Sequence, residues 1–219
     1  MKKLLVILMA ALFVLPMTGV STVEAQNPFA KQLAKERKKQ YKKKMAQYTK
    51  EGWKLVASSK TIEVALLEHY SKLFEKGDAV YELVGIASKV SGPAIGKQRT
   101  LDDATKTYAQ SAKSFVQGRV TSDMANNASD ISTDFDHFYA AYERLVAAEV
   151  KGELKESFTI YRELKGGGME MHTYYIIDQE SATKARLRAM ELAAKETEMA
   201  QKQAEQVSKF IREGFSEYK

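Results

Sequence analysis

The chain has 219 residues and no cysteine, and it carries 34 basic and 28 acidic side chains, for a formal net charge of +6. This length is that of one modest domain. The absence of cysteine excludes disulfide scaffolds, zinc–thiolate sites, thiol catalysis and a lipid anchor attached to a thiol. With 44% hydrophobic and 28% charged residues, the composition is that of a folded soluble protein.

The N-terminus has the three parts of a secretory signal. Two lysines follow Met1, an apolar run extends from Leu4 to Leu15, and small residues precede the expected cleavage site between Ala25 and Gln26. The apolar run has 12 residues, whereas a membrane-spanning helix needs roughly 20. We therefore predict that residues 1–25 are a cleaved signal peptide. The mature protein is expected in the periplasm, with peripheral attachment to the outer membrane or secretion as alternatives.

Positive charge is concentrated directly after this signal. Ten basic and two acidic residues lie in 26–54, a net charge of +8, whereas 55–219 carries −3. We predict a helix over Ala30–Thr49, because good helix formers dominate and no Pro or Gly interrupts them. Such charge runs are usually solvated helix faces. The alternative is an arm that binds anionic lipid, lipopolysaccharide or glycan, through Lys31, Lys35, Arg37, Lys38, Lys39, Lys42, Lys43 and Lys44.

The first half of the remaining chain alternates between helix and strand patterns. Trp53–Val56 is predicted to be an edge strand or a docking clip, with Trp53 buried. A helix opens at Ser58–Ser59 and ends near Gly77, and its apolar positions are Ile62, Leu66, Tyr70, Leu73 and Phe74. Alternation predicts a strand over Val80–Val90. After a loop at Ser91–Gly96, Thr100 and Asp103 resemble a capping box that begins a long helix.

The second half begins with a helix from Ser132 or Thr133, after an expected break at Asn126–Ser129. Two alternating runs follow, joined by the glycines at 166–168 as a hairpin. A final helix is predicted from Ser181 to about Glu213. Each apolar stripe needs a surface to bury. We therefore expect an α+β fold, with a three-stranded, mainly antiparallel sheet covered by helices on one face.

This order of segments resembles a known family. The pattern comprises YELVGIAS from Tyr81, a long alanine-bearing helix, IYRELK from Ile160 and MEMHTYYII from Met169. It is similar to the LPP-twenty lipoprotein family, and also to small exported proteins of unknown function from Bacteroidetes. In those proteins a basic lead-in and a segment like Gly52–Leu55 precede the same domain. The resemblance implies a dodecin-like arrangement, an envelope location and no known enzyme activity. The acylated cysteine of the lipoproteins is missing here.

The sequence contains no motif that predicts a metal, cofactor or catalytic site. His69, His137 and His172 lie on different predicted elements without metal-ligand spacing, and His69 and His172 are expected to be surface or partly buried polar groups. The loop at Gly92–Gln98 has three residues between its glycines where a phosphate loop has four. Two carboxylate pairs are expected at helix starts, where they complement the helix dipole: Asp102 with Asp103, and Asp134 with Asp136.

These observations leave three functional hypotheses. The first is a non-enzymatic cell-envelope protein that associates with other envelope proteins or with itself. The second is a module that binds an anionic membrane surface or glycan through its basic arm. The third and least favoured is an enzyme acting on envelope polysaccharide, which a pocket with two carboxylates, or with a histidine and a carboxylate, would support. Nucleic acid is not an expected partner, because an exported protein rarely meets it.

Overall fold

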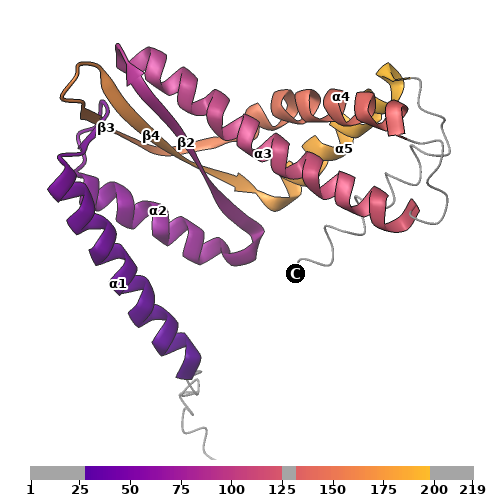
Figure 1. The fold of residues 1–219 in the computed structure, drawn as a ribbon. Coiled ribbons are helices and arrows are strands. Elements are labelled where there is room, and N and C mark those ends of the chain that lie inside the picture. The colour runs from indigo at the N-terminus through magenta and orange to yellow at the C-terminus, as the bar shows by residue number, and fades with distance from the viewer. Residues whose placement is uncertain (1–27, 125–131, 198–219) are drawn as a thin grey trace, which may run out of the picture. The chain divides into compact units, whose positions relative to one another are not determined.

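A computed structural model describes residues 28–124 and 132–197. The elements in chain order (Figure 1) are α1 (Pro28–Glu51), β1 (Lys54–Leu55), α2 (Ile62–Lys76), the 3₁₀ helix η1 (Gly77–Ala79), β2 (Val80–Val90), α3 (Pro93–Met124), α4 (Ser132–Lys151), β3 (Lys155–Glu163), β4 (Met169–Asp178) and α5 (Gln179–Glu196). The predicted signal segment, the break at 126–129 and the part of the predicted last helix beyond Thr197 lie outside the described residues, and α5 itself ends at Glu196. The signal segment therefore stays a prediction.

The fold is α+β, with a four-stranded antiparallel sheet in the order β1-β3-β4-β2. Three strands were expected, and the fourth is the two-residue β1, in which Lys54 pairs with Tyr161 and Leu55 with Ile160. The predicted hairpin is confirmed. Gly167 and Gly168 adopt positive φ values of 85° and 77°, and β3 and β4 pair on either side of them.

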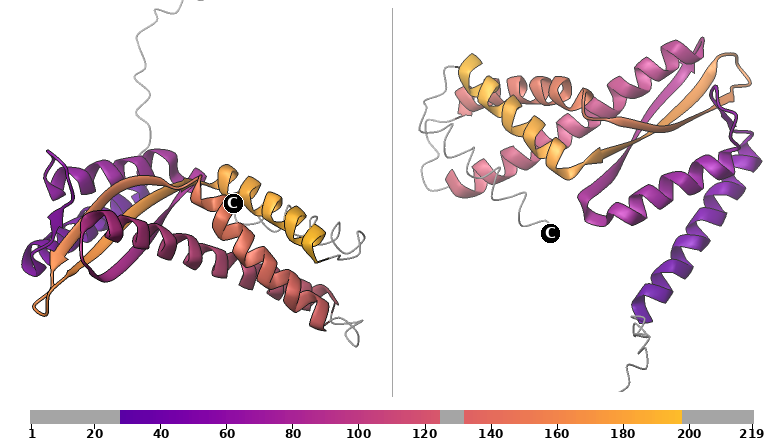
Figure 2. Two further views of the ribbon diagram at one scale, coloured as in Figure 1. Left: turned by 90° about the horizontal axis from the view of Figure 1, so that it is seen from above. Right: turned by 180° about the vertical axis from the view of Figure 1, so that it is seen from behind.

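Helices cover both faces of this sheet, so the expectation of one covered face is wrong. Seen from above in Figure 2, α2 and α3 lie on opposite sides of the strands. On β4, Met171, Thr173 and Tyr175 point toward α3, whereas His172 and Tyr174 point toward the other face. All of these positions except His172 are buried. Since β4 is buried on both sides, one layer of helices cannot satisfy it.

The helix α3 begins seven residues earlier than the capping-box pattern predicts, at Pro93, where a proline is favoured in the first helical turn. Thr100 and Asp103 therefore lie inside the helix. Thr100 Oγ1 lies 2.7 Å from Thr173 Oγ1 on β4, and Asp103 accepts a hydrogen bond from the backbone of β2. These polar residues hold the helix on the sheet and do not cap its start.

The main core lies where α3, α4 and α5 pack together beyond the sheet (Figure 1). Phe135, Phe138, Tyr142 and Val146 recur at helical spacing on one side of α4, and all four are buried. Tyr139, next to them on the helix, is buried as well. These aromatic side chains fill the core and do not line a groove.

The chain divides into two compact units, and the division falls between Lys42 and Lys43, inside α1. The second unit comprises residues 43–219. That unit includes the last residues of α1 and all of the sheet.

Candidate functional site

The eight predicted contact residues of the basic arm fall into two groups. Seven of them, from Lys31 to Lys43, are exposed. Lys44 is half-buried, and its Nζ lies 4.7 Å from the centre of the Tyr174 ring. A cation in this position is attracted to the ring face. Lys44 therefore belongs to the packed second unit rather than to an open cationic surface.

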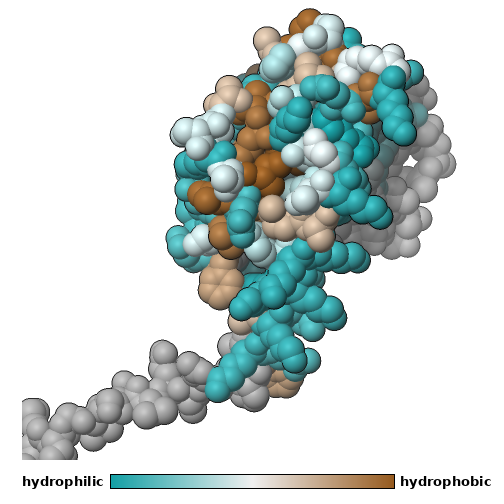
Figure 3. All heavy atoms as spheres, turned by 90° about the vertical axis from the view of Figure 1, so that its left-hand side faces the viewer, coloured by the Kyte–Doolittle hydropathy of each residue, from teal (hydrophilic) through white to brown (hydrophobic). Residues whose placement is uncertain are grey.

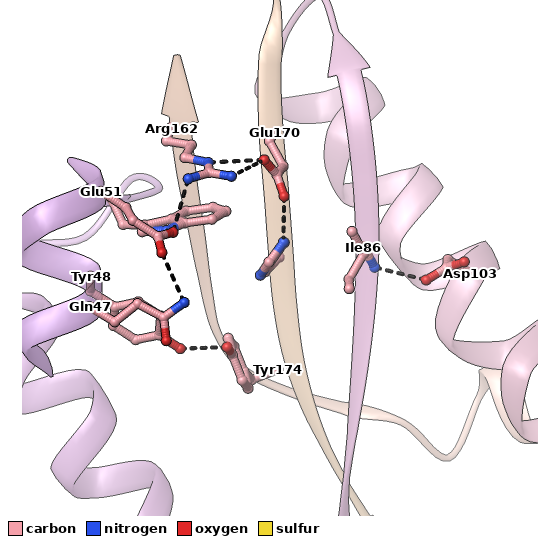
Figure 4. Close-up of polar contacts among 10 residues, drawn as sticks. Gln47, Tyr48, Glu51, Ile86, Asp103, Arg162, Glu170 and Tyr174 are labelled. Atoms are coloured by element: carbon pink, nitrogen blue, oxygen red, sulfur yellow. Dashed lines mark hydrogen bonds and ion pairs between the residues drawn. The ribbon is translucent and has the colours of Figure 1, made fainter. Parts of the chain in front are cut away.

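A network of charged and aromatic side chains joins the end of α1 to the β3–β4 hairpin (Figure 4). Trp53 Nε1 and Arg162 Nη1 both donate hydrogen bonds to Glu51 Oε2, each at 2.9 Å. Arg162 also donates to Glu170 Oε2 through Nε at 2.9 Å and Nη2 at 2.7 Å. His172 Nε2 lies 3.0 Å from Glu170 Oε1. These bonds outweigh the effect of burial and hold the pKa of Glu170 below its ordinary value.

The indole of Trp53 contacts both His172 and Arg162 in this network. Its ring centre lies 4.4 Å from that of His172, and the Arg162 guanidinium lies 4.8 Å from it. The side chain is 7% exposed, so the prediction that Trp53 is buried is confirmed. A buried indole with its N–H satisfied contributes both apolar contact area and a fixed orientation. We infer that this cluster is a clip that fastens α1 to the sheet.

Two tyrosines extend the same contact further along the sheet. The hydroxyls of Tyr48 on α1 and Tyr174 on β4 are hydrogen-bonded to each other, as Figure 4 shows. Phe158 stacks on Tyr174 with ring centres 4.4 Å apart. Burial raises the pKa of Tyr174 to about 12 and the pKa of Tyr48 still further. Both phenols are therefore neutral at physiological pH.

A constellation with catalytic residue types lies under α2. His69 is fully buried, and its Nδ1 lies 3.0 Å from Ser157 Oγ, while its Nε2 is hydrogen-bonded to Glu82 Oε2. The expectation that His69 is surface or partly buried is wrong. Burial acts to raise the pKa of Glu82, but the hydrogen bond from His69 and the charge of Lys44 outweigh it and lower that pKa.

Serine, histidine and carboxylate are the residue types of a hydrolase triad, but this arrangement is packed as an internal bond. The His69 ring is surrounded by Tyr70, Phe158 and Tyr174, with ring centres 5.4–5.7 Å away. A nucleophile also needs substrate access and oxyanion donors. The cluster satisfies the polar groups of a buried imidazole, and we assign no reaction to it.

The other candidates are placed on separate elements. His137 is exposed on α4. The loop at Gly92–Gln98 is mostly the first turns of α3, and a Cβ at Gly96 would lie 1.9 Å from Met171 Sδ, so close helix–sheet packing explains that glycine. Asp102 and Asp103 lie within α3, contrary to expectation. Across 28–124 and 132–197, no three His, Asp or Glu side chains gather as metal ligands.

Sequence reasoning missed Glu51, Glu82, Ser157 and Arg162. Arg162 lies opposite Glu170, an opposite-charge cross-strand pair, because the observed register is centred on Gly166. Centring the hairpin on the three glycines at 166–168 would instead place Arg162 opposite His172. No local pattern marks the others. Ser157 occupies a bulge between the pairs Glu156–Tyr175 and Phe158–Tyr174, and bulges redirect single side chains.

Comparison with known proteins gives no match to a family model, a curated protein or a solved structure. Within the described residues, no helix combines the length and hydropathy needed to cross a bilayer.

Proposed function

We propose that the protein is an exported, non-enzymatic component of the cell envelope that acts by associating with other envelope proteins or with itself. The observation that carries this proposal is an apolar stripe on the outer side of α2. Its members Val64, Leu67 and Phe74 are 41%, 50% and 59% exposed. Phe74 was expected to be buried, but Ala65, Leu66 and His69 occupy the side of α2 that faces the sheet.

Single exposed apolar residues are common and need no explanation. Val64 and Leu67 are neighbours on one helix face, and Phe74 lies on the same face two turns further along, with the exposed Ser71 between them. Ile86 on β2, 48% exposed, lies on the same side of the sheet as α2. Hydrophobic side chains also gather in a band among hydrophilic ones in the view of Figure 3. An apolar surface bordered by polar residues is typical of a protein-interaction site.

The test is the size and partners of the mature chain, 26–219. We expect light scattering at micromolar concentration to show a species larger than the monomer, or crosslinking in the envelope to capture a defined partner. Leu67→Glu should weaken either result, whereas Lys72→Glu, an exposed polar position on the same helix, should not. A strict monomer contradicts self-association, and capture unaffected by Leu67→Glu contradicts a role for α2.

A second candidate function is binding to an anionic surface through α1. It is supported by the seven exposed basic side chains from Lys31 to Lys43 and by Phe29 and Leu33, which are exposed on the same helix. Each basic residue near an anionic membrane contributes about 1 kcal/mol. Because exposed charges are screened within about 8 Å at physiological ionic strength, binding should fall steeply with added salt.

Sedimentation with vesicles containing anionic lipid, with lipopolysaccharide and with acidic glycan tests this candidate. Deleting 26–42 should abolish binding, and replacing Lys31, Lys35 and Lys38 by Gln should weaken it. Binding that is insensitive to salt, or unchanged by the deletion, contradicts the proposal.

The relation to LPP-twenty-like proteins and to a dodecin-like fold belongs to this proposal. It rests on the order of segments, and the missing acylated cysteine leaves the basic arm as the visible means of attachment. An enzyme acting on polysaccharide is the least favoured alternative. The two histidine–carboxylate pairs, His69–Glu82 and His172–Glu170, are engaged in internal contacts.

A further inference from the structure

A cavity of about 430 Å³ lies away from the clip and from the His69 cluster. It is formed by the start of β2, the middle of α3 and the first two turns of α5. Its lining residues are Asp78, Val80, Tyr81, Tyr108, Ser111, Ala112, Phe115, Gln179 and Arg186. This size is within the range of small-molecule sites, which combine apolar walls with a few placed polar groups.

Arg186 supplies a positive charge to this cavity and is unusually buried for a charged residue. Arg186 is 6% exposed, and its guanidinium carbon lies 5.8 Å from the centre of the Tyr108 ring. Its Nη2 donates a hydrogen bond to Thr183 Oγ1 at 2.9 Å, one turn earlier on α5. A guanidinium presents five donors in a planar fork, which matches the geometry of a carboxylate. The buried charge sets the sign of the ligand that the cavity favours.

Tyrosine hydroxyls supply further donors beside this cation. The rings of Tyr81 and Tyr108 stack with centres 6.1 Å apart. Their hydroxyl oxygens are buried and interact with each other, and within the described residues neither forms a hydrogen bond of normal geometry. Burial raises the pKa of both phenols, so they are neutral donors at physiological pH. A buried phenol without a well-formed hydrogen bond is stabilised when a ligand oxygen accepts a hydrogen bond from it.

The remaining lining residues restrict the ligand. Val80, Ala112 and Phe115 provide apolar walls for an aliphatic or aromatic body. Asp78 is exposed and lines the same cavity, so a multiply charged anion such as phosphate would meet repulsion there. A ligand that places a single negative charge beside Arg186 and an apolar body beside Phe115 therefore fits this lining.

We propose that this cavity binds a small organic carboxylate. Arg186 and Tyr108 donate hydrogen bonds to the carboxylate, and the body of the ligand packs against Ala112 and Phe115. This function is independent of the α2 stripe and of the basic arm.

Titration of the mature chain with phenylacetate, followed by amide NMR and calorimetry, tests the proposal. We expect saturable shifts confined to residues 78–81, 108–115 and 179–186. Phenylacetamide has the same aromatic body without the charge, and its affinity should be lower by about tenfold or more. Inorganic phosphate should not compete. No saturable shift up to about 10 mM, equal binding of acid and amide, or shifts elsewhere on the chain would each overturn the proposal.

Variants separate binding from folding. Arg186→Met should reduce phenylacetate affinity about tenfold or more, whereas Lys184→Met, an exposed position on the same helix with the same change in charge, should leave it within about twofold. Wild-type affinity in a folded Arg186→Met protein overturns the proposal. If circular dichroism shows that Arg186→Met does not fold, Tyr108→Phe should weaken binding and Asp78→Asn should strengthen it. Unchanged affinity in both variants overturns the proposal.

Discussion

His172 lies between an indole ring and a carboxylate, and its surroundings act on its protonation in opposite directions. Burial against Trp53 disfavours the charged imidazolium, while Glu170 favours it. Burial is the larger effect, so the pKa of His172 lies below its ordinary value of 6.5. The unfolded chain consequently binds more protons at this residue than the folded chain does. Its contribution to stability is complete above pH 6.5 and is lost as the pH falls through the folded pKa.

We therefore predict that the free energy of unfolding decreases as the pH falls below 6.5. His172→Gln should remove this part of the decrease, because glutamine does not titrate. Urea unfolding between pH 8 and pH 4 in half-unit steps, for both proteins, measures the difference. Parallel pH profiles between pH 6.5 and pH 5 would contradict the assignment to His172.

A further loss should occur in stronger acid in both proteins. The pKa values of Glu82, Glu170 and Asp178 are lowered from 4.5, 4.5 and 3.8 respectively. Their stabilising effect is present above those values and is lost as each is protonated in the folded state. A loss at this lower pH that persists in His172→Gln separates the carboxylates from the histidine.

At the scale of elements, α3 crosses β2 in close contact. A Cβ at Gly85 would lie 1.8 Å from the carbonyl oxygen of Thr100, a backbone atom in the middle of a helix. At Gly96, one turn before Thr100, a Cβ would meet Met171 Sδ. The two glycines let the helix and the sheet approach each other, and the rigid backbone at Gly85 makes that position the less adaptable.

We predict that Gly85→Ala lowers the free energy of unfolding by about 3 kcal/mol, because α3 must move away from the sheet. Gly118→Ala is the matched control on α3, where a Cβ would meet nothing within 4 Å. It should raise stability by about 0.5–1 kcal/mol through helix propensity. Urea unfolding measures both variants, and equal effects at the two positions would contradict the close crossing.

The same crossing protects the open edge of the sheet. Strand β2 is at the edge, and its Ile86 amide donates a hydrogen bond of 2.8 Å to Asp103 Oδ2 on α3. Unpaired amides on an edge strand invite pairing with another chain. A helix carboxylate that occupies one of them blocks that approach locally.

Asp103→Ala should therefore speed hydrogen exchange of the Ile86 amide by about tenfold, the equivalent of one charged hydrogen bond. Asp102→Ala is the matched control, since Asp102 contacts Gln98 and Lys151 and not the strand. NMR-detected exchange reports each amide separately. An unchanged rate at Ile86 in Asp103→Ala would show that this contact does not protect the edge.

At the scale of the whole molecule, the chain divides into a charged N-terminal unit and a second unit in which helices cover both faces of the sheet. The division between compact units falls at Lys42–Lys43, inside α1. Tyr48, Glu51 and Trp53 belong to the second unit, and all three contact its sheet. We infer that the functional arm ends near Lys42 and that the rest of α1 is part of the domain.

A chain that starts at Lys43 should accordingly have a free energy of unfolding within about 1 kcal/mol of that of the mature chain. A chain that starts at Ala57 lacks the clip, and it should lose at least about 3 kcal/mol, the typical cost of removing a buried tryptophan. Thermal and urea unfolding of the two shortened chains measure this. A large loss on removing 26–42 alone would place a stabilising role in the arm.

The sequence determined what depends on local pattern. Alternation defined β2, β3 and β4, glycines defined the hairpin, and the charge count located the basic arm, because each of these is a property of residues close together in the chain. Local pattern misplaced the start of α3, since Thr100 has the residue type of a cap and its hydroxyl is used instead to bond Thr173.

Only the tertiary structure decided which residues from distant segments meet. It covered the second face of the sheet, buried His69 between Ser157 and Glu82, and left Phe74 on the outside of α2. It also brought Arg186 of α5 against Tyr108 of α3. The physical reason is that burial and hydrogen bonding at these positions depend on contacts between residues 13 to 88 positions apart, and helical or alternating periodicity carries no information about such pairs.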